Sequence, residues 1–93
     1  MADPISDNAV RKSVADAIGR VLRDTGRPVP ESIADEDTFA AKLKLDSLDM
    51  AVLVVALETD LGVDPFRSGV APVRTFGALV NVYLVACQQK GDS

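Results

Sequence analysis

The sequence contains no histidine and no tryptophan, and it has a single cysteine, Cys87. Without histidine, a Ser-His-Asp triad and the usual zinc sites are excluded. One cysteine cannot form an internal disulfide framework, and we expect Cys87 to be a small buried hydrophobe. These absences argue against most enzyme chemistries in a chain of 93 residues. We therefore expect neither catalytic residues nor a metal site.

Aromatic residues are also scarce, at 4% of the chain, whereas hydrophobic residues make up 47%. The core must then be built from aliphatic side chains. A length of 93 residues suits one small domain and not two. We expect a single domain over residues 1–93, with an ordered core at about residues 5–89.

Long hydrophobic runs are missing as well. The longest wholly apolar run, Met50 to Leu57, is far too short to span a bilayer. The start, Met1-Ala2-Asp3-Pro4, lacks the basic region and apolar run of a signal peptide. The sequence thus predicts a soluble, cytoplasmic, monomeric protein that has no membrane partner.

Charge is unevenly distributed along the chain, whose net charge is −4. Residues 31–64 contain nine acidic and two basic side chains, whereas the flanking thirds are slightly positive. Phosphate repels such a surface, so nucleic acid is not expected as a partner. A basic protein partner would be attracted to it. The alternative is that the acids only keep a small domain in solution.

Hydrophobic periodicity predicts two amphipathic helices, over residues 5–25 and 75–89. Ser6 and Thr75 are candidate caps. Residues 65–68 predict one short helical turn, because Pro65 suits a first helical position. The apolar stripe of the first helix comprises Val10, Val14, Ala17, Ile18, Val21 and Leu22, and that of the last comprises Phe76, Leu79, Val80, Tyr83, Ala86 and Cys87. No segment shows the period of a strand.

Residues 26–46 form an unusually long connection, and long loops in compact domains tend to be functional or anchored. Its prolines and its acidic cluster, residues 35–37, are typical of a loop. We expect Phe39, Leu43 and Leu45 to anchor it in the core. The segment from Thr38 to Leu43 is expected to form a single helical turn.

The most apolar helix is predicted from Ser47 to Leu61, with Gly62 as its stop. One stripe, assigned to the core, contains Met50, Leu53, Val54, Leu57 and Leu61. A second stripe, Leu48, Val52, Val55 and Thr59, lies about 200° away, so both cannot face one small core. Either another element covers the second stripe, or it is exposed for a partner, with Asp49, Glu58 and Asp60 at its rim.

Ser47 lies where the long connection becomes this helix. Either Asp46 or Ser47 has the short oxygen-bearing side chain that caps a helix start. The motif Asp46-Ser47-Leu48-Asp49, followed by the apolar run, resembles the modification site of acyl carrier proteins. The order of a helix, a long loop, this motif at a helix start, a short helix and a final helix extends the resemblance over nearly the whole chain.

The resemblance implies an all-α fold: a small four-helix bundle of three main helices and one short helix, with a long first loop. It implies that Ser47 carries 4′-phosphopantetheine from coenzyme A, with Asp46 and Leu48 beside it. A phosphopantetheinyl transferase would attach this arm, which would hold an acyl group as a thioester. Acyl-loading and acyl-processing enzymes, with basic or apolar docking surfaces, would contact Leu48, Asp49, Val52, Val55, Glu58 and Asp60. The domain itself would catalyse nothing.

Two positions depart from the family pattern. Lys44 stands where many members have glycine or alanine, and Val52 stands at a position that is often acidic in fatty-acid carriers. Val52 therefore favours a specialised pathway, such as polyketide or nonribosomal peptide assembly. Two alternatives remain open: a carrier of amino acids or peptides, and an unmodified helical interaction module.

Overall fold

The computed structural model describes residues 7–68 and 73–92 of the chain. Three α-helices, α1 (Asp7–Asp24), α2 (Ser47–Leu61) and α3 (Phe76–Asp92), are joined by loops and one 3-10 helix, η1 (Pro65–Ser68). The described residues form no strand beyond an isolated bridge between Thr38 and Thr75. The expected all-α bundle of three main helices and one short helix is confirmed.

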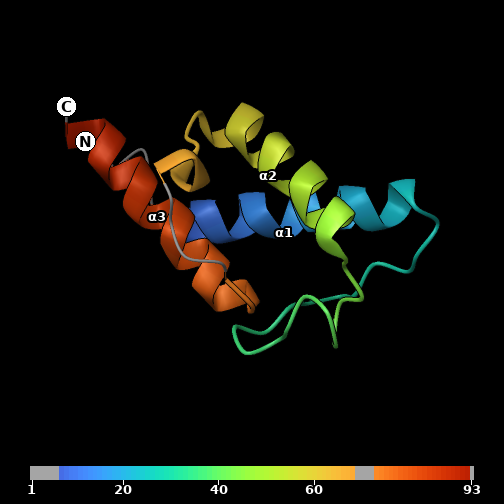
Figure 1. Cartoon of the computed structure of the whole chain (residues 1–93). Coiled ribbons are helices and arrows are strands. Elements are labelled where there is room, and N and C mark those ends of the chain that lie inside the picture. Colours follow the sequence, from blue (N-terminus) through green and yellow to red (C-terminus); the bar gives the residue numbers. More distant parts are fainter. Residues whose placement is uncertain (1–6, 69–72, 93) are drawn as a thin grey trace.

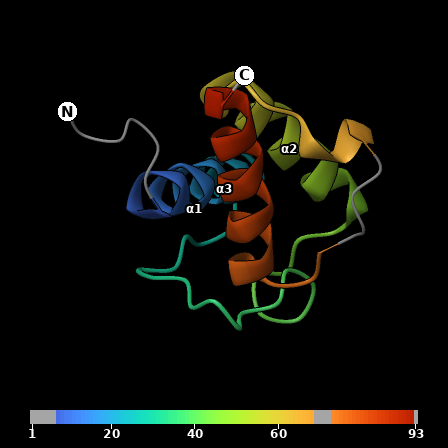
Figure 2. The ribbon, with the colours of Figure 1, turned by 90° about the vertical axis from the view of Figure 1, so that its left-hand side faces the viewer.

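The bundle is organised around α1, which packs against both α2 and α3. α2 runs back obliquely across α1, and α3 crosses near the N-terminal end of α1 (Figures 1 and 2). η1 packs against α3. The long loop connects the far end of α1 to the start of α2 along one side of the bundle (Figure 1). The start of α2 is therefore held beside the C-terminal end of α1.

The helix ends follow local chemistry. α1 ends after Asp24, where Gly26 adopts a left-handed conformation with φ of 75° that glycine tolerates without strain. Thr75 caps α3 as expected, because its Oγ1 accepts the N–H of Ala78 at 3.2 Å. The proposed cap Ser6 lies outside the described residues. α3 continues to Asp92, beyond the predicted end at Gln89, since one glycine costs a helix only about 1 kcal/mol.

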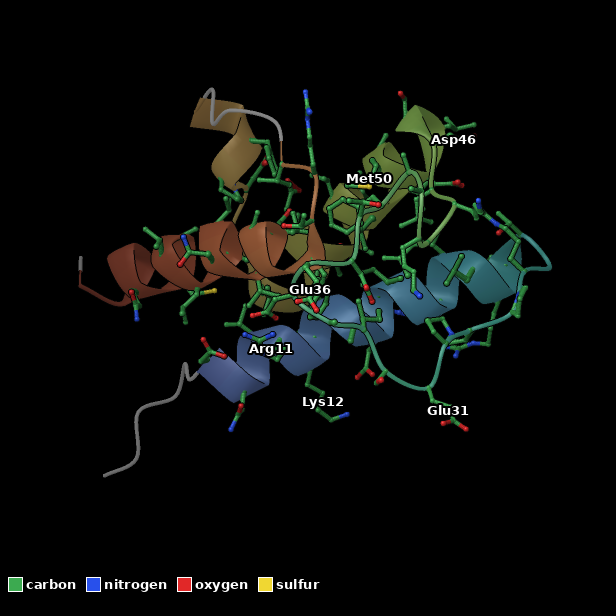
Figure 3. The ribbon with its side chains drawn as sticks, turned by 90° about the horizontal axis from the view of Figure 1, so that it is seen from below. Arg11, Lys12, Glu31, Glu36, Asp46 and Met50 are labelled. Carbon is green, nitrogen blue, oxygen red and sulfur yellow. The ribbon has the colours of Figure 1, made fainter. Side chains whose placement is uncertain are left out.

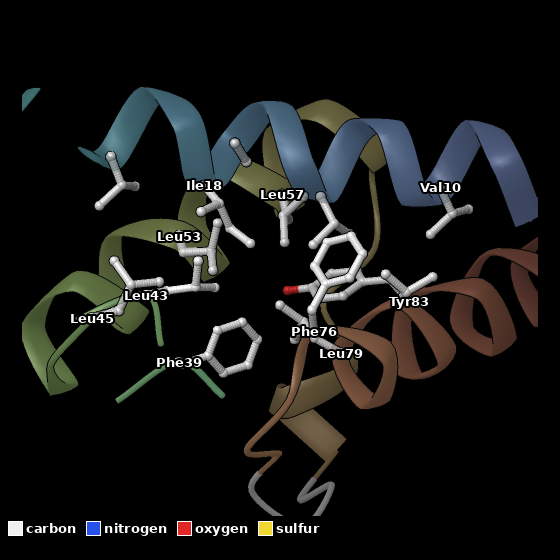
Figure 4. Packing of buried hydrophobic residues seen from close by; sticks show 14 of the residues in the cluster. Val10, Ile18, Phe39, Leu43, Leu45, Leu53, Leu57, Phe76, Leu79 and Tyr83 are labelled. Atoms are coloured by element: carbon white, nitrogen blue, oxygen red, sulfur yellow. The ribbon is translucent and has the colours of Figure 1, made fainter. Parts of the chain in front are cut away.

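One apolar cluster forms the core (Figure 4). All six residues of the predicted α1 stripe are buried, and so are the predicted α3 residues except Ala86, which is half-buried. Cys87 is buried, as expected of a small core hydrophobe. In Figure 4 the hydroxyl of Tyr83 points into the middle of this cluster, and it has no hydrogen-bond partner there.

The long loop is anchored by the three side chains that the sequence predicted, since Phe39, Leu43 and Leu45 are all buried. Figure 4 shows them next to Leu53 of α2. The single helical turn expected from Thr38 to Leu43 is present as an isolated turn: the Lys42 N–H donates to the Thr38 carbonyl at 3.1 Å, four residues back, and the Leu43 N–H donates to the same carbonyl. At the start of this turn, Thr38 is bridged to Thr75.

The loop is also tied to the start of α3 (Figure 3 shows this side). The Gly77 N–H donates to the Asp35 carbonyl at 2.9 Å, and the Asp35 carboxylate pairs with Arg11. The Arg11 guanidinium also lies over the Phe76 ring, 5.8 Å from its centroid. A Cβ atom on Gly77 would lie 2.8 Å from the Asp35 Cβ, so this contact requires glycine.

Candidate functional site

The N-terminus of α2 is closed by Asp46, which settles the choice between Asp46 and Ser47 as the cap. The Asp46 backbone is extended, and its carboxylate accepts the N–H of Asp49 at 2.8 Å. The Asp49 carboxylate in turn accepts the Asp46 N–H at 3.1 Å. This reciprocal pair is a capping box that satisfies two backbone donors at once.

Ser47 is the first residue of α2 and its side chain is exposed. Because Asp46 supplies the cap, the Ser47 hydroxyl is not used for it. Within the described part of the chain the hydroxyl makes no hydrogen bond. The serine predicted from the motif is thus presented to solvent at a helix start.

Asp49 does not lie where the sequence suggested. We expected its carboxylate at the rim of the exposed strip, but the residue is only 9% exposed. The Arg27 guanidinium binds the Asp49 carboxylate at 2.8 Å, and the Asp46 N–H donates to the same oxygen. The pKa of Asp49 is lowered below its usual value, mainly by the hydrogen bond from the Asp46 N–H and next by that from Arg27. The side chain is therefore a fixed anion that faces the loop.

Arg27 connects three parts of the chain at this end of the bundle. Besides Asp49, its guanidinium contacts the Thr25 hydroxyl at 2.9 Å and the backbone carbonyl of Lys44. Lys44 has a φ of 60°, in the left-handed region that is unfavourable for a residue with a Cβ. Glycine would adopt this conformation without strain.

The two faces of α2 differ as the sequence predicted. Leu53 and Leu57 are fully buried, whereas Leu48, Val52 and Val55 are 74%, 52% and 64% exposed. Among residues 7–68 and 73–92, no other element therefore covers the second stripe. We call Leu48, Val52 and Val55 the exposed strip. The core stripe is narrower than expected, since Met50, Val54 and Leu61 are only half-buried.

The acidic residues around the exposed strip are mostly engaged. Asp60 pairs with Arg20 of α1, and Asp49 pairs with Arg27. Of the acidic residues in α2, Glu58 alone has no ion pair with a described residue, and it is exposed. The strip is therefore an apolar surface with little uncompensated charge of its own.

An open groove of about 970 Å³ begins beside Ser47 and runs along α2. Half-buried Met50 and Val54, placed in the core from the sequence, line it. Figure 3 views this side of the molecule, with Asp46 just before α2 and Met50 in its first turn, next to the loop. The lining comprises Thr38, Phe39, Ala40, Ala41, Leu45, Asp46, Ser47, Met50, Ala51, Val54, Phe66, Val73 and Arg74. Its position depends on how the loop and η1 approach α2, which periodicity does not reveal.

Among the described residues, no His, Cys, Asp and Glu side chains gather in a group of three or more that would hold a metal ion. None of the described helices has both the length and the apolar character that a membrane crossing requires.

Comparison with known proteins identifies a family for most of the chain. Residues 9–81 match the family model described as "Phosphopantetheine attachment site", a range that includes most of α1, the long loop, α2, η1 and the start of α3. Searches of curated proteins and of solved structures gave no significant match. Members of the matched family are carriers without catalytic activity, to which 4′-phosphopantetheine is covalently attached. The chain therefore belongs to the phosphopantetheine-binding family of acyl and peptidyl carrier proteins.

Proposed function

We propose that Ser47 is the residue to which phosphopantetheine is attached. One observation carries this assignment: Asp46 caps α2, which leaves the Ser47 hydroxyl exposed and without an intramolecular hydrogen bond. A serine engaged as a cap would have to give up that bond before it could react. Here the nucleophile is already accessible to a transferase.

The surroundings of Ser47 suit the phosphate of the arm. The N–H groups of Ser47 and Leu48 have no acceptor within α2, because the first N–H groups of a helix lack intrahelical partners. Such groups, together with the helix dipole, favour an anion at this end. In the transfer, the serine oxygen forms a phosphodiester bond and the nucleotide part of coenzyme A leaves. We assign the base that removes the serine proton to the transferase.

The arm would carry an acyl intermediate as a thioester and present it to successive enzymes at a raised effective concentration. The groove beside Ser47 is lined mostly by apolar side chains. This lining favours an aliphatic acyl cargo over an aminoacyl cargo, whose ammonium group loses hydration in apolar surroundings. Polyketide, fatty-acid or related biosynthesis is therefore our first assignment, and a nonribosomal peptide-type carrier is the alternative.

The exposed strip is proposed as the docking surface for the transferase and the acyl-processing enzymes. An apolar centre with charge at its edge is the usual composition of such an interface. Leu48, Val52 and Val55 supply the centre, and Glu58 supplies charge. Because Asp49 and Asp60 are paired within the chain, partners with apolar docking surfaces fit this strip better than strongly basic ones.

Intact-protein mass spectrometry tests the attachment site directly. Incubation with coenzyme A, magnesium and a promiscuous phosphopantetheinyl transferase should add one phosphopantetheine to the wild type and none to Ser47→Ala. The matched control is Ser32→Ala, which removes another exposed serine, in the long loop, and should be modified like the wild type. An unchanged mass of the wild type would instead favour the unmodified interaction module.

A second experiment tests the docking surface. Val52→Glu places a charge in the centre of the exposed strip and should weaken binding to partner enzymes. Asn81→Glu adds the same charge at an exposed position of α3 and serves as the control. Equal affinities of both variants and the wild type for every partner would show that the strip is not the docking surface.

A further inference from the structure

We propose that Arg27 is a positioning residue for the modification of Ser47. This inference rests on the proposed attachment site. Arg27 lies just beyond the end of α1, and its side chain is 27% exposed. It does not contact Ser47, and its effect would pass through the groups that it holds on either side of the serine.

The first of these groups is the Asp49 carboxylate, two residues after Ser47. The contact between the Arg27 Nη2 and the Asp49 Oδ2 atoms is 2.8 Å, and the Asp49 side chain is only 12% exposed. The same carboxylate oxygen accepts the Asp46 N–H, so Arg27 fixes one half of the capping box. A charge-assisted hydrogen bond of this kind is stronger and more directional than a neutral one.

The second group is the Lys44 carbonyl, three residues before Ser47. The Arg27 Nη1 atom donates to this carbonyl, and Lys44 is held in the left-handed conformation described above. The planar guanidinium can donate in two directions at once, which a lysine ammonium on a flexible stem cannot do with the same geometry. Arg27 therefore fixes both the loop that enters α2 and the first turn of α2.

Ser47 lies between these two fixed points, so the backbone that carries its hydroxyl is held on both sides. Group transfer is sensitive to such placement, because a displacement of about 1 Å can cost orders of magnitude in rate. Loss of Arg27 would free the Lys44 carbonyl and leave Asp49 without its cation. The transferase would then have to select a productive arrangement of the first turn from several.

A control for simple helix packing is present in the same molecule. Arg20 pairs with Asp60, so it also joins α1 to α2, but at the other end of α2. Arg20→Ala therefore removes an ion pair between the same two helices without affecting the turn that contains Ser47. Arg27→Lys is the conservative variant, which keeps the positive charge but cannot donate to the Lys44 carbonyl and the Asp49 carboxylate with the same geometry.

The experiment measures transferase kinetics with coenzyme A as donor and each full-length variant as acceptor, at a temperature where circular dichroism shows every variant folded. We expect kcat/KM for Arg27→Ala to fall about fivefold to tenfold, roughly the effect of one ordinary hydrogen bond. Arg27→Lys should lie between Arg27→Ala and the wild type, and Arg20→Ala should match the wild type.

Two further readouts separate positioning from a general loss of stability. In Arg27→Ala, amide hydrogen exchange should accelerate at Asp49 and stay unchanged at Leu57, in the body of α2. The pKa of Asp49, measured by carboxyl-carbon NMR, should rise because one of the contacts that lower it is gone. If Arg27→Ala does not fold, Arg27→Lys and Asp49→Asn take its place in the same assays.

A folded Arg27→Ala variant that accepts the arm at the wild-type rate would overturn this inference while leaving the attachment site intact. An equal loss in Arg20→Ala would also overturn it, because the effect would then be one of helix packing. Failure of the wild type to accept any phosphopantetheine would instead contradict the assignment of Ser47.

Discussion

The two faces of α2 allow stability and partner binding to be separated with adjacent residues. Leu53 is fully buried against α1 and the loop anchors, whereas Val52, next to it in the sequence, is 52% exposed. We predict that Leu53→Ala destabilises the fold strongly, whereas Val52→Ala leaves its stability nearly unchanged and weakens partner binding.

The magnitude follows from burial. Removing a fully buried leucine side chain to alanine costs about 2.7–5 kcal/mol, because the lost transfer free energy is joined by a cavity term. A domain of this length has a total free energy of unfolding of roughly 5–14 kcal/mol. Leu53→Ala therefore removes about 3 kcal/mol and lowers the Tm by roughly 12–24 °C. Val52→Ala should change the free energy of unfolding by less than about 0.5 kcal/mol.

Urea unfolding followed by far-UV circular dichroism is the suitable assay, because the chain has no tryptophan. The midpoint should move to lower urea for Leu53→Ala at an unchanged m-value. Equal losses of stability in the two variants would refute the assignment of the faces. A Leu53→Ala variant within about 1 kcal/mol of the wild type would refute the packing of α2.

Three other changes test particular contacts. Burial raises the pKa of the Tyr83 hydroxyl to about 12, so ionisation of this group favours the unfolded chain. The free energy of unfolding is unaffected by this group below pH 10 and falls as the pH rises from about 10 to 12. Tyr83→Phe should abolish that loss and, by removing an unpartnered buried hydroxyl, raise stability at neutral pH by about 1 kcal/mol, as measured by urea unfolding. Gly77→Ala should cost about 1–2 kcal/mol, because its Cβ would displace Asp35. Gly19→Ala should stabilise α1 by up to about 1 kcal/mol, because its Cβ would make only ordinary contacts at 3.5 Å. Thermal melts in which the two variants have the same Tm would contradict this prediction. Lys44→Gly should leave the free energy of unfolding unchanged or raise it by up to about 1 kcal/mol, because glycine adopts a φ of 60° without strain, and a clear loss in urea unfolding would show that the lysine side chain itself stabilises the turn.

Most of the architecture could be predicted from local patterns. The apolar periodicity of α1 and α3 fixes which face is buried, and it depends only on helix geometry. The two-sided pattern of α2 showed that its second stripe is either covered by another element or exposed, and the structure has Val52 and Val55 exposed. The loop anchors could be predicted because Phe39, Leu43 and Leu45 are isolated large hydrophobes in a polar segment.

What could not be predicted depends on contacts between distant segments. Asp49 looked like a surface acid because Arg27, its partner, is 22 residues away and belongs to another element. The groove beside Ser47 likewise depends on where the loop and η1 lie. One signal was available: the four residues from Asp46 to Asp49 have an acid at each end. This is the spacing of a capping box, and it indicates Asp46 as the cap.

The pairing of Asp49 and Asp60 with arginines of the same chain has a kinetic consequence for the docking face. Carboxylates that are already neutralised by ion pairs within the chain exert little electrostatic attraction on an approaching enzyme. Association at this face would then proceed near the unsteered rate of about 10⁵–10⁶ M⁻¹s⁻¹ and vary little with ionic strength. Discrimination between successive enzymes would then depend on the dissociation rate of each complex and not on its association rate.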